Sequence, residues 1–233
     1  MLDRTFAGRF EEHRLSERVR LRLAPTRKFK TALVKVFVRT DLDAATATEV
    51  AALPYVLRHG TRSLPSKREL TRSLEALYGA SLGVDVLKLG EQQVISLSLQ
   101  VLGDRFLPPG ERVFERGLRI LCDLLCDPAL DEQGALRAEA VRQEKEKLRR
   151  FIEGLINDKG SYAAQRCIER MCRDEPYGVF EYGRLSDLAA VDGAALEARR
   201  RALLAEAPID VYVVGAVEAE RARQAIAEAL RLP

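Results

Sequence analysis

Apolar and polar residues alternate along several stretches of this chain, and a period of two is typical of strands with one buried face. Residues 92–102 show it best, because the odd-numbered positions from 95 to 101 are apolar and their neighbours are mostly polar. The tight Gly90-Glu91 turn joins this stretch to residues 82–89, which predicts a hairpin. The predicted strands are 18–23, 31–38, 82–89, 92–102 and 209–215.

Helical periodicity and capping residues mark most of the remaining chain. Ser66, with Glu69 three residues later, forms a capping box that predicts the start of a helix. Asp41 or Asp43 is expected to cap the helix before it, and Gly60 to end that helix. The predicted helices span 44–59, 67–78, 112–126, 133–155, 162–172, 186–190, 193–205 and 218–230.

This order of elements predicts an α+β fold with one mostly antiparallel sheet that helices cover on one face. Hydrophobic residues make up 47% of the 233 positions, which is enough for a sizeable core. No internal repeat or low-complexity linker divides the chain. We therefore expect residues 1–233 to form a single domain.

Charge gives little indication of a partner. The net charge is +3, with 31% charged residues and no long run of one sign, so neither nucleic acid nor a membrane surface is expected to bind. The charged segment Met1–Glu12 does not read as a signal peptide, and no apolar stretch approaches the roughly 20 residues of a membrane span. These features predict a cytoplasmic protein.

Four cysteines are spaced too loosely for a zinc knuckle, with each pair four or five residues apart on a predicted helix. Free buried thiols in a reducing compartment are the better interpretation. No cofactor is expected. The four are Cys122, Cys126, Cys167 and Cys172.

Several strings occur in the order in which M16 (pitrilysin and mitochondrial-processing-peptidase-like) metallopeptidases have them. Leu53–Thr61 (LPYVLRHGT) with Pro65 resembles the end of the metal-binding helix, Leu77–Ser81 (LYGAS) a following turn, and Val141–Glu144 (VRQE) the third-ligand segment. The chain thus resembles the N-terminal half of an M16 protein, which implies an M16-like or LuxS-like metallohydrolase domain. With KFKT as a further shared string, it most resembles bacterial M16-like proteins encoded as partners of an active peptidase.

The metal motif of that family is missing. Active members carry His-x-x-Glu-His, in which two imidazoles on one helical face bind zinc and the glutamate acts as general base. Alignment on the Gly60-Thr61 pair puts Ala51, Pro54 and Tyr55 at those three positions. Alanine cannot bind a metal, proline has no base, and tyrosine is a rare ligand. The resemblance therefore implies a chain without catalytic residues and without a metal.

Two other residues bear on the same helix. His13 and His59 are the chain's two histidines, too far apart to share a helical face, and we interpret His59 as a helix-end residue favoured by the helix dipole. Pro54 removes a helical hydrogen bond, so we expect a kinked packing helix.

Glu144 lies within an apolar stripe of the long predicted helix, three residues after Val141 and four before Leu148. A carboxylate there must be paired or protonated. The resemblance makes it the vestigial third metal ligand, now paired with an arginine or with the Tyr55 hydroxyl. The alternative is that its side chain reaches solvent at the edge of a helix–helix groove.

The strand that binds substrate in the family also differs here, because Gly83-Val84 replaces the common Asn-Ala. Leu82–Lys88 could still add a peptide by β-augmentation if it lies at a sheet edge. The candidate binding residues are Leu82, Gly83, Val84, Asp85 and Val86.

The resemblance implies a non-catalytic subunit that pairs with an active zinc-bearing homologue, or with itself, and helps to bind peptide. The arginine and tyrosine that hold substrate from the second half of M16 proteins are not in this chain. Two alternatives remain: a zinc endopeptidase by homology, and a stand-alone peptide-binding or scaffold module.

Overall fold

The computed structural model describes residues 10–232. The prediction about a signal peptide concerned residues 1–12, and most of that segment lies outside the described residues. Within them, no helix combines the length and the apolar character that crossing a membrane requires.

The strands form one mixed sheet of six in the order β1-β2-β6-β3-β5-β4. β2 and β6 are parallel, and every other neighbouring pair is antiparallel, which confirms the predicted sheet. The short β1 was not predicted. The strands are β1 (Glu11–Arg14), β2 (Val19–Pro25), β3 (Thr31–Asp41), β4 (Ser81–Leu89), β5 (Gln92–Leu102) and β6 (Ile209–Gly215).

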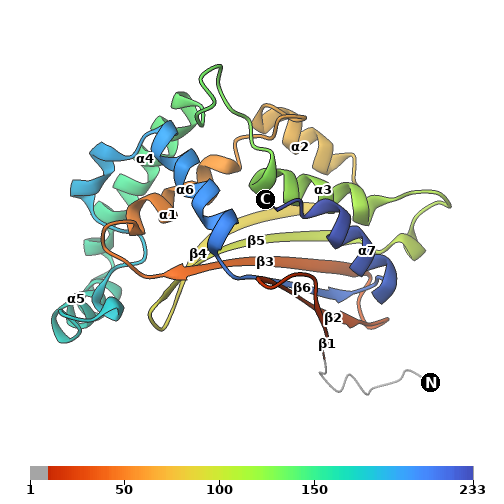
Figure 1. The fold of residues 1–233 in the computed structure, drawn as a ribbon, viewed down its shortest axis with the longest axis horizontal. Helices are drawn as coiled ribbons and strands as arrows, with labels where there is room; N and C mark the ends of the chain where they lie inside the picture. The colour runs from red at the N-terminus through yellow and green to blue at the C-terminus, as the bar shows by residue number, and fades with distance from the viewer. Residues whose placement is uncertain (1–9, 233) are drawn as a thin grey trace.

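Helices pack over one face of this sheet, as predicted, and α5 stands apart at one end of the molecule (Figure 1). Short 3-10 segments link them: η1 (Asp104–Phe106), η2 (Leu155–Asn157), η3 (Pro176–Gly178) and η4 (Leu185–Ala190). The α-helices are α1 (Ala47–Leu57), α2 (Lys67–Glu75), α3 (Val113–Cys126), α4 (Ala138–Gly154), α5 (Lys159–Met171), α6 (Gly193–Glu206) and α7 (Ala219–Ala229).

The capping interactions confirm one predicted helix start and show that the predicted cap of another helix is wrong. The Ser66 hydroxyl accepts a hydrogen bond from the Glu69 amide at 3.2 Å, as the capping box predicts. The predicted aspartate cap of α1 is wrong, because the N-cap residue is Thr46 and makes no side-chain cap. Asp43 instead closes a turn by accepting from the Ala45 amide at 2.9 Å.

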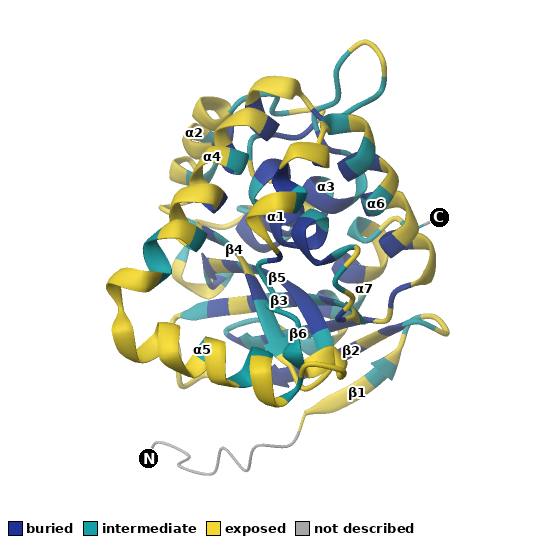
Figure 2. Cartoon of the chain, turned by 90° about the vertical axis from the view of Figure 1, so that its left-hand side faces the viewer, coloured by how far each residue is buried: buried dark blue, intermediate teal, exposed yellow. Residues whose placement is uncertain are grey.

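The core lies between the sheet and the covering helices, and α1 and α3 are its most buried helices (Figure 2). α5 contributes no buried residue. The cysteine prediction is partly corrected: all four thiols are free, but Cys122 is buried and Cys167 exposed.

Candidate functional site

α1 carries the three positions of the missing metal motif. It stays helical through Pro54 to Leu57, and most of its side chains are buried because it packs on the sheet and on α4 and α6. Ala51 is fully buried, and Pro54 is buried beside it, so neither offers a polar atom to a metal. Tyr55 is half-buried and is the only one of the three with a polar side chain.

Glu144, on α4, faces the end of α1. Its side chain is only 7% exposed, and its Oε1 lies 2.6 Å from Nε2 of His59. The same oxygen accepts from Nζ of Lys67 at 3.0 Å and from Nζ of Lys147 at 2.7 Å. The prediction that an arginine or Tyr55 pairs with Glu144 is therefore wrong. His59 contacts this carboxylate as well as lying at the helix end.

These contacts keep Glu144 charged. Burial by itself would raise the pKa of this carboxyl, but the hydrogen bonds from His59, Lys147 and Lys67 outweigh burial and hold the pKa at about 2. Two ammonium groups thus supply positive charge at the carboxylate that the M16 resemblance predicts to be a vestigial metal ligand. No group of three or more His, Cys, Asp or Glu side chains that could hold a metal occurs within residues 10–232.

Tyr55 turns toward the sheet. Its hydroxyl donates to Oδ1 of Asp85 on β4 at 3.3 Å, and Tyr182 lies beside it. Burial, followed by the nearby Tyr182 and Asp85, raises the pKa of Tyr55 far above its ordinary value, so its phenol stays protonated. The second histidine position now links α1 to the edge of the sheet.

Within residues 10–232, β4 is one of the two edge strands of the sheet, and it pairs with β5 alone. The amide of Val86 donates to Oδ1 of Asp85 at 2.9 Å, and its carbonyl accepts from the Tyr182 hydroxyl at 3.4 Å. Both main-chain groups of Val86 therefore point outward and are capped. Because inward and outward residues alternate in an antiparallel strand, Leu82 and Val84 also point outward. Within residues 10–232, no hydrogen bond caps the outward main-chain groups of these two residues.

Comparison with known proteins now bears on this site. No family model matches the chain. The chain is 32% identical to "Probable inactive metalloprotease YmfF" of Bacillus subtilis (strain 168) over 204 residues, 88% of this chain and 48% of that protein. The chain is therefore similar to an inactive metalloprotease, as its resemblance to M16 proteins predicted. The name of that relative agrees with the degenerate motif at Ala51, Pro54 and Tyr55.

Solved structures share the M16 fold. A conserved protein from Enterococcus faecalis V583 has a TM-score of 0.88 at 26% identity, over 96% of this chain and 52% of that one. The inactive domain of an M16 peptidase from Pseudomonas fluorescens has a TM-score of 0.75 at 16% identity, over 95% and 50%. The chain thus spans about half the length of each of these three proteins.

Two hollows adjoin Glu144 and share Tyr55 and Lys147. The smaller, of about 230 Å³, is closed by Phe151 and Tyr182. The larger, of about 390 Å³, opens toward α2 and includes Lys67.

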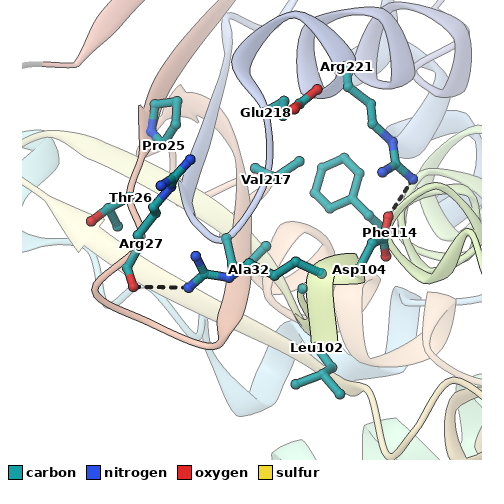
Figure 3. Close-up of a pocket in the computed structure, with 13 residues that line it drawn as sticks. Pro25, Thr26, Arg27, Ala32, Leu102, Asp104, Phe114, Val217, Glu218 and Arg221 are labelled. Atoms are coloured by element: carbon teal, nitrogen blue, oxygen red, sulfur yellow. Dashed lines mark hydrogen bonds and ion pairs between the residues drawn. The ribbon is translucent and has the colours of Figure 1, made fainter. Parts of the chain in front are cut away.

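Another cavity, of about 560 Å³, lies where β5 ends and α7 begins (Figure 3). Phe114 gives it an apolar wall, and Arg221 reaches across to pair with Asp104. Arg105 donates to the main-chain carbonyl of Arg27 at 3.0 Å, which ties two loops together. Ala51, Pro54, Tyr55 and Glu144 are not among the residues that line this cavity.

Sequence reasoning singled out Ala51, Pro54, Tyr55 and Glu144, whose alignment with the metal motif stays a prediction, and it missed the cations around Glu144. Lys147 could have been found, because residues three apart on a helix are neighbours. Lys67 and Tyr182 carry no such signal, since they reach the site from distant parts of the chain.

Proposed function

We propose that this M16 chain is a non-catalytic subunit that pairs with an active, zinc-bearing M16 homologue and helps to form its peptide-binding chamber. In this proposal residues 1–233 form one M16 domain, and another polypeptide supplies the companion half. The proposal also places the protein in the cytoplasm, where free thiols stay reduced.

The exposure of α5 is the observation that supports the pairing. None of its 13 residues is buried, and it contacts chiefly the short segments η2 and η3 beside it. Large apolar side chains are nevertheless exposed here, including Met171 at 76% and Ile156 at 60%. We call this surface the α5 patch: Phe151, Ile156, Tyr162, Met171 and Tyr177.

A helix in this position needs a partner for stability. Isolated helices of about this length are marginal in water, and most helical stability comes from packing an apolar face. Large apolar side chains that are exposed together on one element can also mark an interaction site. The B. subtilis relative has about as much chain again as it shares with this one. A second M16 half is therefore the partner that we propose for the α5 patch.

Sedimentation velocity at micromolar concentration tests the pairing, with this chain alone and mixed with an M16 homologue from the same genome that keeps His-x-x-Glu-His. We expect a mixed complex and an altered rate of peptide cleavage by the homologue. The double variant Ile156→Glu, Met171→Glu should weaken the complex by at least about tenfold, because both changes bury a charge in the interface.

Phe29→Glu is the matched control, since Phe29 is 46% exposed and lies outside the α5 patch. It should leave the complex unchanged. A chain that forms only a homodimer would contradict pairing with an active subunit. A monomer that neither binds the homologue nor changes its cleavage would instead favour a stand-alone module.

A further inference from the structure

The larger hollow beside Glu144 is strongly cationic. Arg58, Lys67 and Lys147 line it, and Glu144 is its one acidic residue. Its floor is apolar, formed by Leu70 and Leu74. Three cations around a single carboxylate leave an excess of positive charge.

The two lysines are available to a ligand. Their side chains are 45% exposed for Lys67 and 62% exposed for Lys147. An ammonium group has three donors, and within residues 10–232 each of these lysines makes one hydrogen bond, to the same oxygen of Glu144. Donors on both lysines are therefore free for an anionic oxygen at the mouth of the hollow.

The edge of the sheet is closed next to this hollow. Leu82 and Val84 can pair with an added strand, but Asp85 and Tyr182 occupy the outward groups of Val86. Tyr55 connects the two features, since it contacts Asp85 and lines the hollow. An added peptide must leave the edge where the cations begin. A chain end suits this geometry better than the middle of a longer chain.

We propose that this hollow binds the free C-terminal carboxylate of a peptide, with Lys67 and Lys147 as donors and Leu70 and Leu74 against the last side chain. The proposal rests on the peptide binding proposed above. In this proposal the site no longer serves a metal that would polarise a peptide bond. Its ammonium groups instead bind an end product of proteolysis. Hydrogen bonds between charged groups are the stronger kind.

Isothermal titration calorimetry on the full chain tests the inference. The probes are N-acetylated pentapeptides of Ala, Val and Leu, each as a free acid and as a C-terminal amide. A third set, amides with one internal glutamate, separates the main-chain carboxylate from a side-chain one. We expect the free acids to bind at least about tenfold more tightly than either amide set.

The double variant Lys67→Met, Lys147→Met should remove this preference. Lys67→Met alone, at an exposed position, should reduce it in case the double variant is unstable. Arg150→Met is the matched control, because Arg150 is exposed on α4, pairs with Glu146 and does not line the hollow. It should keep the full preference.

The outcomes separate this inference from the proposed function. Equal binding of acids and amides would overturn carboxylate recognition and leave peptide binding intact. Carboxylate recognition at the chain end would also be overturned if amides with an internal glutamate bound as tightly as the free acids. Absence of binding by all three sets would overturn both the inference and the peptide-binding role, whereas pairing through the α5 patch would still stand on its own test.

Discussion

Oε1 of Glu144 lies 2.6 Å from Nε2 of His59, so the predicted vestigial ligand is held by a histidine outside the predicted metal motif. His59 lies four residues after Tyr55, the predicted second histidine position. With Lys67 and Lys147 on the same oxygen, the carboxylate has no need of a metal to stay charged in a buried place.

The first prediction concerns metal content. Purified protein should contain no stoichiometric zinc, because Ala51 and Pro54 offer no ligand atom and lysines surround Glu144. Elemental analysis after dialysis against a zinc-containing buffer measures this. If each chain bound one zinc ion tightly and Glu144→Ala abolished that binding, the interpretation of the site would be wrong.

Glu144→Gln should destabilise the fold at neutral pH by about 1–3 kcal/mol, since it leaves three cationic or polar groups without their shared carboxylate. Chemical denaturation measures the change. Glu146→Gln is a control on the same helix, because Glu146 is exposed and paired only with surface arginines, and should have a much smaller effect. Equal effects of the two variants would show that the cluster is unimportant for stability.

The Glu144 effect should depend on pH in a defined direction. The pKa of Glu144 is lowered in the folded state from an ordinary 4.5 to about 2, so its stabilisation is complete above about pH 4.5 and is lost as pH falls toward 2. The stability difference between wild type and Glu144→Gln should therefore shrink across that window. A difference that stays constant from pH 5 to pH 2.5 would count against a charged Glu144.

Restoring the metal motif tests whether the two lysines beside Glu144 compete with zinc. The triple variant Ala51→His, Pro54→Glu, Tyr55→His should bind zinc only weakly, because Lys67 and Lys147 compete with the metal for Glu144. Adding Lys67→Ala and Lys147→Ala should tighten zinc binding by at least about tenfold.

Stability limits that experiment. Ala51 is fully buried, so the larger imidazole should cost about 1–3 kcal/mol. Folding of both variants is checked by circular dichroism. Equal zinc affinity with and without the lysines would show that they do not compete with a metal.

The capped edge of β4 predicts a local exchange pattern. Asp85→Ala removes the acceptor of the Val86 amide, so that amide should exchange with solvent at least about tenfold faster. The Leu87 amide should be unaffected, because it faces β5 by alternation along the strand. Amide exchange followed by NMR distinguishes them. Unchanged exchange at Val86 would mean that Asp85 does not protect the edge.

The same contacts show how far sequence could go. Alternation predicted the β4–β5 hairpin, and Ser66 with Glu69 predicted the start of α2, because both patterns act through neighbours. The start of α1 was missed since several polar residues compete for the cap, and the structure uses none of their side chains for it.

Sequence alone determined that this chain lacks the M16 zinc motif, because the identity of Ala51, Pro54 and Tyr55 settles which atoms are present. It could not determine what replaced the metal. Lys67 and His59 lie 77 and 85 residues from Glu144, and Tyr182 lies 96 residues from Val86. Contacts over such separations depend on how distant elements pack together, so only the tertiary structure decided which charges meet Glu144 and how much of the β4 edge stays open.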